Sequence, residues 1–94
     1  MEEIKEIADK ILPILKRYGV SKAALFGSLV RGDVAEKSDL NILVEIEKDI
    51  SLLDFVGLKL ELEEILGRKV DLVEYCTLKP IIRERVLREQ VPIL

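Results

Sequence analysis

The sequence predicts a small α/β (α+β) domain in which a mixed sheet carries helices mainly on one face. Three short apolar segments have the length and patterning of strands, and segments with helical spacing separate them. The composition is that of a globular protein, with 49% hydrophobic and 35% charged residues. Because its 94 residues are fewer than the roughly 100–150 of a typical domain, we expect residues 1–94 to form one domain.

The first helix is expected from Glu2 to Tyr18, where apolar residues recur every three or four positions. These residues are Ile4, Ile7, Ala8, Ile11, Leu12, Leu15 and Tyr18. Pro13 lies within this segment, and its missing N–H predicts a kink or a restart of the helix. Gly19 is expected to end the helix as a left-handed cap.

Two strands are expected next, with a turn between them. Residues 23–26 form a short apolar run that ends in Gly27-Ser28, and a helical turn and loop follow over residues 29–38. Residues 39–46 alternate between apolar side chains on one face and a second face that includes Asp39 and Asn41. A period of two predicts a strand.

The next helix is expected to start at Ser51 as N-cap, with Asp54 in its first turn, and to stop at Gly67. Its apolar residues are more numerous than one buried face requires, so some of them are expected at an interface. They are Leu52, Leu53, Phe55, Val56, Leu58, Leu60 and Leu62.

The third strand is expected over residues 69–75, followed by a helix that Thr77 caps and that has Pro80 in its first turn. The apolar tail Val91–Leu94 is expected to pack as an edge strand or to contact a partner. The overall order α-β-α-β-α-β-α is that of a small mixed sheet with its helices mainly on one side.

Charge and composition exclude several classes of protein. No apolar run approaches the roughly 18–20 residues that span a bilayer. A net charge of −3 argues against a surface that coats nucleic acid, which needs a basic excess. The single cysteine, Cys76, cannot form an internal disulfide, so a cytoplasmic location is expected.

A small group of polar residues lies where the predicted strands meet. Gly27-Ser28 ends the first strand, Asp39 and Asn41 lie on the second, and Asp71 lies on the third. A turn with exposed N–H groups and a hydroxyl can bind phosphate. Side chains two residues apart on a strand share a face, so their oxygens can share metal ions. Mg²⁺ needs only one or two carboxylates in addition to substrate phosphates.

The segment from Phe26 to Asn41 resembles the signature of the minimal nucleotidyltransferases of the DNA polymerase β superfamily. In that family, Gly-Ser is followed by ten residues and then by Asp-x-Asp, and residues 29–38 supply the ten. The Arg31-Gly32 pair is also similar, Asp71 falls where the family has its third carboxylate, and residues 78–89 are similar to the C-terminal helix.

The resemblance implies a single nucleotidyltransferase palm that uses a two-ion Mg²⁺ site and ATP, the nucleoside triphosphate donor. Gly27 and Ser28 would hold the triphosphate, Asp39 and Asp71 would ligate metal, and Arg31 would brace the loop or approach the phosphates. Small stand-alone members resemble antitoxins that transfer AMP to a tyrosine of a HEPN-domain ribonuclease. The expected partner is therefore a HEPN-type protein, and the short chain is also compatible with a homodimer.

Asn41 departs from the family pattern, which has an aspartate in this position. An amide offers one neutral carbonyl oxygen and cannot bridge two Mg²⁺ ions as a carboxylate does. The resemblance therefore implies weakened transfer, and both an introduced change and a natural loss of catalysis agree with the sequence. The alternative function is a degenerate palm that neutralises a partner by contact alone.

Each of these residues also has a purely structural interpretation. Gly27 could end a strand, Asp39 could cap a turn, and Asp71 could pair with a nearby cation. A ferredoxin-like interaction domain without a nucleotide site would require all of the spacings to be coincidental. The structural interpretations taken singly do not predict that Asp39, Asn41 and Asp71 share one cleft, which is what the nucleotidyltransferase hypothesis predicts.

Overall fold

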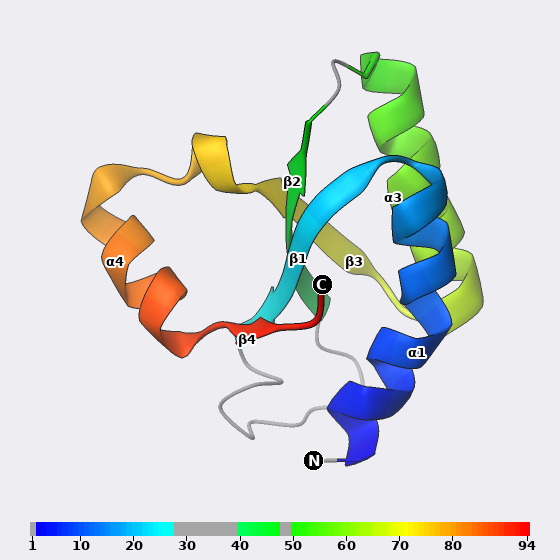
Figure 1. Ribbon diagram of the computed structural model, residues 1–94, viewed down its shortest axis with the longest axis horizontal. Helices are drawn as coiled ribbons and strands as arrows, with labels where there is room; N and C mark the ends of the chain where they lie inside the picture. The colour runs from blue at the N-terminus through cyan, green and yellow to red at the C-terminus, as the bar shows by residue number, and fades with distance from the viewer. Residues whose placement is uncertain (1, 28–39, 48–49) are drawn as a thin grey trace.

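A computed structural model describes residues 2–27, 40–47 and 50–94. The elements run in the order α1 (Glu2–Arg17), β1 (Val20–Phe26), β2 (Leu40–Ile46), α3 (Leu52–Leu66), β3 (Val70–Glu74), the 3₁₀ helix η1 (Tyr75–Thr77), α4 (Pro80–Glu89) and β4 (Val91–Pro92) (Figure 1). The helical turn expected over residues 29–38 lies outside the described residues.

The four strands form one mixed sheet in the order β3-β2-β1-β4. β1 pairs antiparallel with both β2 and β4, whereas β2 and β3 run parallel. Helices α1 and α3 lie side by side on one face of the sheet, and α4 lies on the other side (Figure 1). The expected mixed sheet with helices mainly on one face is therefore confirmed.

Side chains that alternate along β2 contribute to two hydrophobic clusters, one on each face of the sheet. Leu40, Ile42 and Val44 are buried on the side of α1 and α3, where most of the buried apolar residues gather. Leu43 belongs to a smaller cluster on the opposite face, together with Ala24 and Leu78, and Val86 of α4 packs against it. The two faces of the sheet therefore differ, because one carries the main core and the other is only partly covered.

The predicted helix caps of the middle of the chain are confirmed. The Asp54 N–H donates to the Ser51 hydroxyl oxygen over 3.1 Å at the start of α3. Gly67 ends α3 at a φ of +65°, and its N–H donates to the carbonyl oxygen of Glu63. Gly19, two residues after the end of α1, has a φ of +78°, as expected of a left-handed cap.

Three local expectations need correction. The helix does not restart at Pro13, since α1 is continuous; Pro13 and Asp9 are both exposed, so the carbonyl that lacks a helical donor can be hydrated. Thr77 does not cap α4, because its hydroxyl donates to the carbonyl of Glu74 within η1 and Lys79 occupies the N-cap position. β1 begins at Val20, earlier than expected, because Val20 pairs with Ile46 across the sheet.

The C-terminal tail forms the expected edge strand within the chain itself. Val91 pairs with Leu25 of β1, and Pro92 pairs with Ala24. The N–H of Ile93 donates to the carbonyl of Ala23 over 2.9 Å. Across residues 2–27, 40–47 and 50–94, none of the helices has the length and apolar character needed to cross a bilayer.

Candidate functional site

The described part of the candidate site lies where the end of β1 meets the starts of β2 and β3. Asn41 is the register partner of Phe26 on the antiparallel side and of Asp71 on the parallel side. The three residues therefore form one row across neighbouring strands. Their neighbours in β2 and β3 are buried under α1 and α3, so alternation places Asn41 and Asp71 on the opposite, partly covered face.

Gly27 is in direct contact with this row. It has a φ of +87°, a conformation that residues with a Cβ rarely adopt. A Cβ placed on Gly27 would overlap the amide nitrogen of Asn41 and stand 3.2 Å from its Cγ. The backbone of the turn after β1 can therefore approach the Asn41 side chain only because position 27 is glycine.

The two polar side chains of this row differ in charge and exposure. Asn41 is half-buried and neutral, whereas Asp71 is exposed and has a carboxylate. An amide oxygen and a carboxylate are both hard oxygen donors of the kind Mg²⁺ prefers, so the pair fits one magnesium ion whose other ligands come from substrate. The resemblance requires a bridging carboxylate at position 41 of β2. Asn41 does not supply it, because its side chain is an amide.

Three predicted site residues, Ser28, Arg31 and Asp39, lie outside the described residues. Within the described residues, no three His, Cys, Asp or Glu side chains group closely enough to hold a metal ion. In the sequence, Asp39 directly precedes Leu40, the first residue of β2. The described part of the site consists of Gly27, Asn41 and Asp71.

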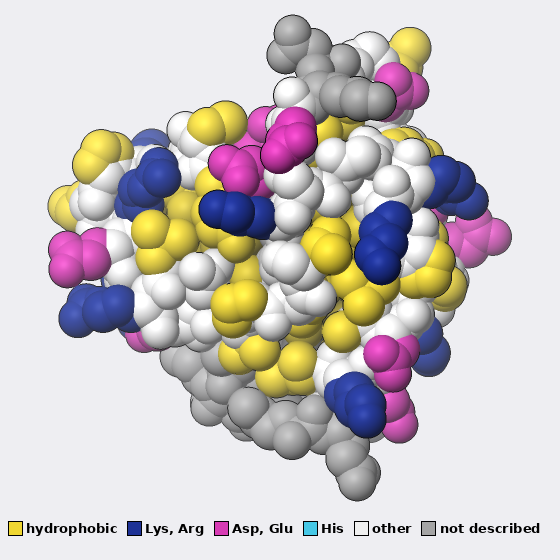
Figure 2. All heavy atoms as spheres, in the orientation of Figure 1, with side chains coloured by type: hydrophobic (Ala, Val, Ile, Leu, Met, Phe, Trp, Pro, Cys, Tyr) yellow, Lys and Arg dark blue, Asp and Glu magenta, His cyan; other side chains and the backbone are white. Residues whose placement is uncertain are grey.

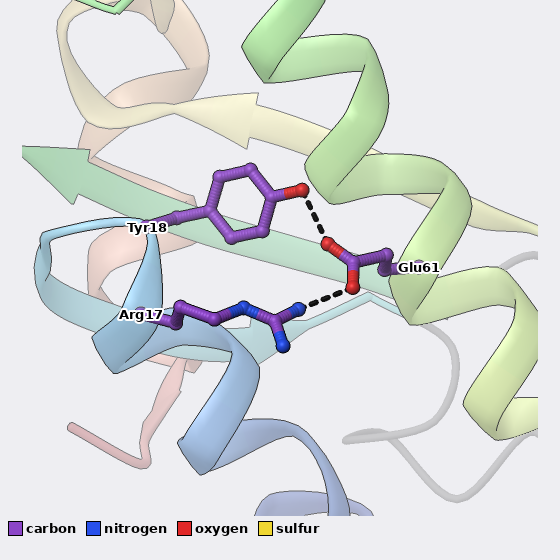
Figure 3. Close-up of polar contacts among 3 residues, drawn as sticks. All are labelled: Arg17, Tyr18 and Glu61. Atoms are coloured by element: carbon purple, nitrogen blue, oxygen red, sulfur yellow. Dashed lines mark hydrogen bonds and ion pairs between the residues drawn. The ribbon is translucent and has the colours of Figure 1, made fainter.

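A polar cluster on the far side of the sheet joins the two helices of the main layer. Arg17 and Tyr18 both donate hydrogen bonds to the carboxylate of Glu61 on α3 (Figure 3). These hydrogen bonds lower the pKa of Glu61, and the bond to Glu61 is the main reason that the pKa of Tyr18 is raised. This cluster links α1 to α3 and does not contribute to the candidate site.

Charged side chains are dispersed over the surface. On the face shown in Figure 2, Lys and Arg side chains are separated from one another, with Asp and Glu between several of them. Lys22 on β1 forms an ion pair with Glu45 on β2, and their charged atoms lie 3.8 Å apart. Among the described residues, this face has no continuous basic tract.

Apolar side chains remain exposed on α3. Leu53 is 83% exposed and Leu60 is 56% exposed, and Val56 lies between them at helical spacing. On the other side of the same helix, Leu58 and Leu62 are fully buried in the core. A helix with apolar side chains on two opposite sides is typically covered by protein on both sides.

The sequence matches a known family over nearly its whole length. Residues 9–94 match the family described as "Polymerase beta, Nucleotidyltransferase". The chain belongs to this family. The nucleotidyltransferase family that the Gly27-Ser28 and Asp39-x-Asn41 spacing resembles is therefore confirmed.

Two curated relatives match over almost all of their own length. A Methanocaldococcus jannaschii protein, provisionally named protein adenylyltransferase MJ0435, is 48% identical over 91 residues, which are 97% of this chain and 98% of that protein. Protein adenylyltransferase MntA of Thermococcus cleftensis is 46% identical over 92 residues, or 97% of this chain and 93% of that protein.

Solved structures share the fold. One, provisionally described as a minimal nucleotidyltransferase, has a TM-score of 0.84 at 42% identity and covers 97% of this chain and 93% of its own. A toxin–antitoxin structure with AMP-PNP has a TM-score of 0.80 at 22% identity, over 93% of this chain and 72% of that one. An MNT antitoxin in complex with a tri-AMPylated HEPN toxin of Shewanella oneidensis has a TM-score of 0.74 at 20% identity, over 96% and 71%. The two structures at 22% and 20% identity are similar to this chain in fold alone.

Proposed function

We propose that this chain is a Mg²⁺-dependent protein adenylyltransferase that transfers AMP from ATP to a tyrosine of a HEPN-type partner and so acts as an antitoxin. The observation that carries the proposal is the pairing of Asn41 with Asp71 beside the Gly27 turn, at the end of the sheet. The names of the two relatives with 48% and 46% identity support adenylyl transfer. The fold neighbours that contain AMP-PNP or an AMPylated HEPN toxin support the donor and the partner.

In the proposed reaction, an oxygen of the acceptor attacks the α-phosphorus of ATP. One P–O bond forms to the tyrosine oxygen, the bond from the α-phosphorus to the bridging oxygen breaks, and pyrophosphate leaves with the electron pair. The hydroxyl proton passes to solvent or to a carboxylate. Magnesium, when bound, would neutralise phosphate charge and orient the phosphates.

The residues of the chain have separate tasks in this proposal. The Gly27-Ser28 turn holds the triphosphate, because glycine at position 27 has no Cβ that would keep a phosphate away from the backbone. Asp39, Asn41 and Asp71 supply the metal-ligating oxygens, and Arg31 braces the loop or contacts phosphate. The half-buried Asn41 contributes one neutral oxygen, so the chain transfers AMP more slowly than a relative with aspartate at this position.

A second candidate function rests on Asn41 itself. If a single neutral oxygen at position 41 is too little for catalysis, the domain neutralises its partner by contact alone. The exposed apolar residues Leu53 and Leu60 on α3 favour a protein partner in either case. We propose the HEPN-type protein as that partner, and a homodimer is the alternative outcome of the association test below. The free, exposed thiol of Cys76 agrees with a cytoplasmic location.

The test of the proposed function is transfer of ³²P from α-labelled ATP to a co-expressed HEPN-type protein in the presence of Mg²⁺. The proposal predicts slow labelling on tyrosine with release of pyrophosphate in equal amount. The variant Asp71→Asn should abolish labelling while the fold is retained, because Asp71 is exposed and makes no contribution to the core. Neutralisation of the partner without any labelling would favour the contact-only function.

A further inference from the structure

We infer that Glu63 of α3 is a positioning residue for the candidate site, because its carboxylate fixes the peptide group that aligns Asp71 with Asn41. This inference rests on the proposed function for its catalytic meaning. Glu63 is on the main-core side of the sheet, whereas Asn41 and Asp71 are on the other face, so Glu63 acts through the backbone of β3 and not by touching substrate.

The Lys69–Val70 peptide group is held from both sides. Its carbonyl oxygen, on Lys69, accepts the N–H of Leu40 over 2.9 Å. Its N–H, on Val70, donates to Oε2 of Glu63 over 2.9 Å. The C=O and N–H of one peptide point in opposite directions, so the first bond ties β3 to β2 and the second ties β3 to α3.

The Lys69–Val70 peptide group directly precedes Asp71, the register partner of Asn41. Asp71 follows Val70 in β3, and Asn41 follows Leu40 in β2. Among the described residues, Leu40↔Val70 is the first pair of the parallel ladder and Asn41↔Asp71 is the second. β3 is an end strand of the described sheet, so a shift at its start is opposed by β2 on one side only. The Glu63 carboxylate supplies the constraint on the other side.

The backbone of Glu63 is itself well fixed. Its carbonyl oxygen accepts the N–H of Gly67 over 2.8 Å in the left-handed cap of α3. The preceding residue, Leu62, is fully buried in the core. The half-buried Glu63 side chain therefore extends from a rigid point and can place the Val70 N–H with little freedom. The next residue, Glu64, is exposed, and no described hydrogen bond of its side chain reaches β3.

The test compares Glu63→Ala, Glu63→Gln and the control Glu64→Ala. Mn²⁺ with ATP serves as the probe, and its affinity is measured by electron paramagnetic resonance. The hydrogen exchange of the Val70 amide is measured by NMR on the same samples. Glu63→Ala should speed Val70 exchange at least ~10-fold and weaken Mn²⁺–ATP binding by about 10-fold, the usual effect of removing a group that orients a metal ligand.

Glu63→Gln keeps an acceptor oxygen at the same distance from the backbone, so its Val70 exchange rate and its Mn²⁺–ATP affinity should equal those of the unmodified chain. Glu64→Ala should change neither the exchange rate nor the affinity. A loss of thermal stability in Glu63→Ala without any change in Mn²⁺–ATP affinity would overturn the inference, since it would show a merely structural role. If Glu63→Ala does not fold, Glu63→Asp takes its place, because its shorter side chain keeps the charge but cannot reach Val70.

The two hypotheses fail in different ways. If the unmodified chain binds no Mn²⁺–ATP, the metal part of the proposed function fails. The positioning inference is then decided by NMR contacts between Asn41 and Asp71, which should weaken in Glu63→Ala and recover in Glu63→Gln. Unchanged Asn41–Asp71 contacts in Glu63→Ala would refute it.

Discussion

The side-chain amide of Asn41 occupies the space that a Cβ on Gly27 would need. A Cβ at position 27 would stand 3.2 Å from Cγ of Asn41 and overlap the amide nitrogen. Gly27 ends β1 and Asn41 lies near the start of β2, so this contact joins the turn after one strand to the side chain of its neighbour. The contact couples the proposed phosphate-binding turn to the proposed metal-ligand position.

Gly27→Ala should therefore impair both stability and nucleotide binding. The left-handed conformation alone costs a residue with a Cβ roughly 1–2 kcal/mol, and the overlap with Asn41 adds to it. We expect the unfolding temperature to fall by more than about 4 °C and ATP binding to be lost. Calorimetry and a fluorescent ATP analogue measure the two effects.

Gly19→Ala is the matched control for this prediction. Gly19 has a similar φ of +78°, but a Cβ there meets no atom within 4 Å. It should show the backbone strain of roughly 1–2 kcal/mol without loss of ATP binding. Equal ATP affinity in Gly27→Ala and Gly19→Ala would contradict the coupling of the turn to Asn41.

The cluster of Arg17, Tyr18 and Glu61 predicts a pH dependence of stability. Hydrogen bonds from Tyr18 and Arg17 lower the pKa of Glu61 below its ordinary value of 4.5. A carboxyl group whose pKa is lowered by folding stabilises the protein above pH 4.5, and this stabilisation disappears as the pH falls through the folded pKa. Glu61→Gln should therefore lower the unfolding temperature at pH 7, and the difference from the unmodified chain should shrink toward zero in acid.

Tyr18 provides the complementary measurement. Its pKa is raised above 10.0, mainly by the hydrogen bond to Glu61, so its contribution is present below pH 10 and is lost at higher pH. In a double-mutant cycle, Tyr18→Phe should reduce the effect of Glu61→Gln. Additive effects of the two substitutions would show that the hydrogen bond contributes nothing to stability. ATP binding should be unchanged in both variants, because the cluster is on the far side of the sheet.

The exposed apolar residues of α3 predict where the protein partner binds. The double variant Leu53→Ser, Leu60→Ser should weaken binding of the co-expressed HEPN-type protein by at least ~10-fold, as loss of central apolar contacts typically does. The unfolding temperature of the isolated chain should be nearly unchanged, because both side chains are exposed. Light scattering measures self-association, and titration calorimetry measures binding of the HEPN-type protein. A double variant that binds the HEPN-type protein normally but no longer self-associates would indicate that these residues form a homodimer interface instead.

Local chemistry explains which parts of the fold could be predicted from the sequence. Ser51 and Gly67 were predicted as the caps of α3 because capping depends on residues within one turn of the helix. The start of β1 at Val20 could not be predicted, since it depends on pairing with Ile46 of another strand. Pro13 was expected to interrupt α1, but the burial of Ile11 and Leu15 on either side of it outweighs one missing hydrogen bond.

The same distinction applies to the site. The spacing of Gly27, Asn41 and Asp71 was visible in the sequence because alternation along strands fixes the face of each side chain. The contact between Gly27 and Asn41 and the bond from Glu63 to Val70 were not visible, because both join separate elements. The structure places Gly27, Asn41 and Asp71 near one another, but the roles of all the predicted site residues stay predictions, and Ser28, Arg31 and Asp39 lie outside the described residues.

The most direct test of the proposed chemistry is the change Asn41→Asp, assayed by incorporation of labelled AMP into the HEPN-type protein. It adds the missing carboxylate next to Asp71, so transfer should rise by at least ~10²-fold, with a matching rise in pyrophosphate release. Asp39→Asn in that background should remove the gain, because metal sharing requires both acids. Unchanged transfer in Asn41→Asp, with ATP binding intact and the partner present, would contradict the proposed chemistry and favour the contact-only function.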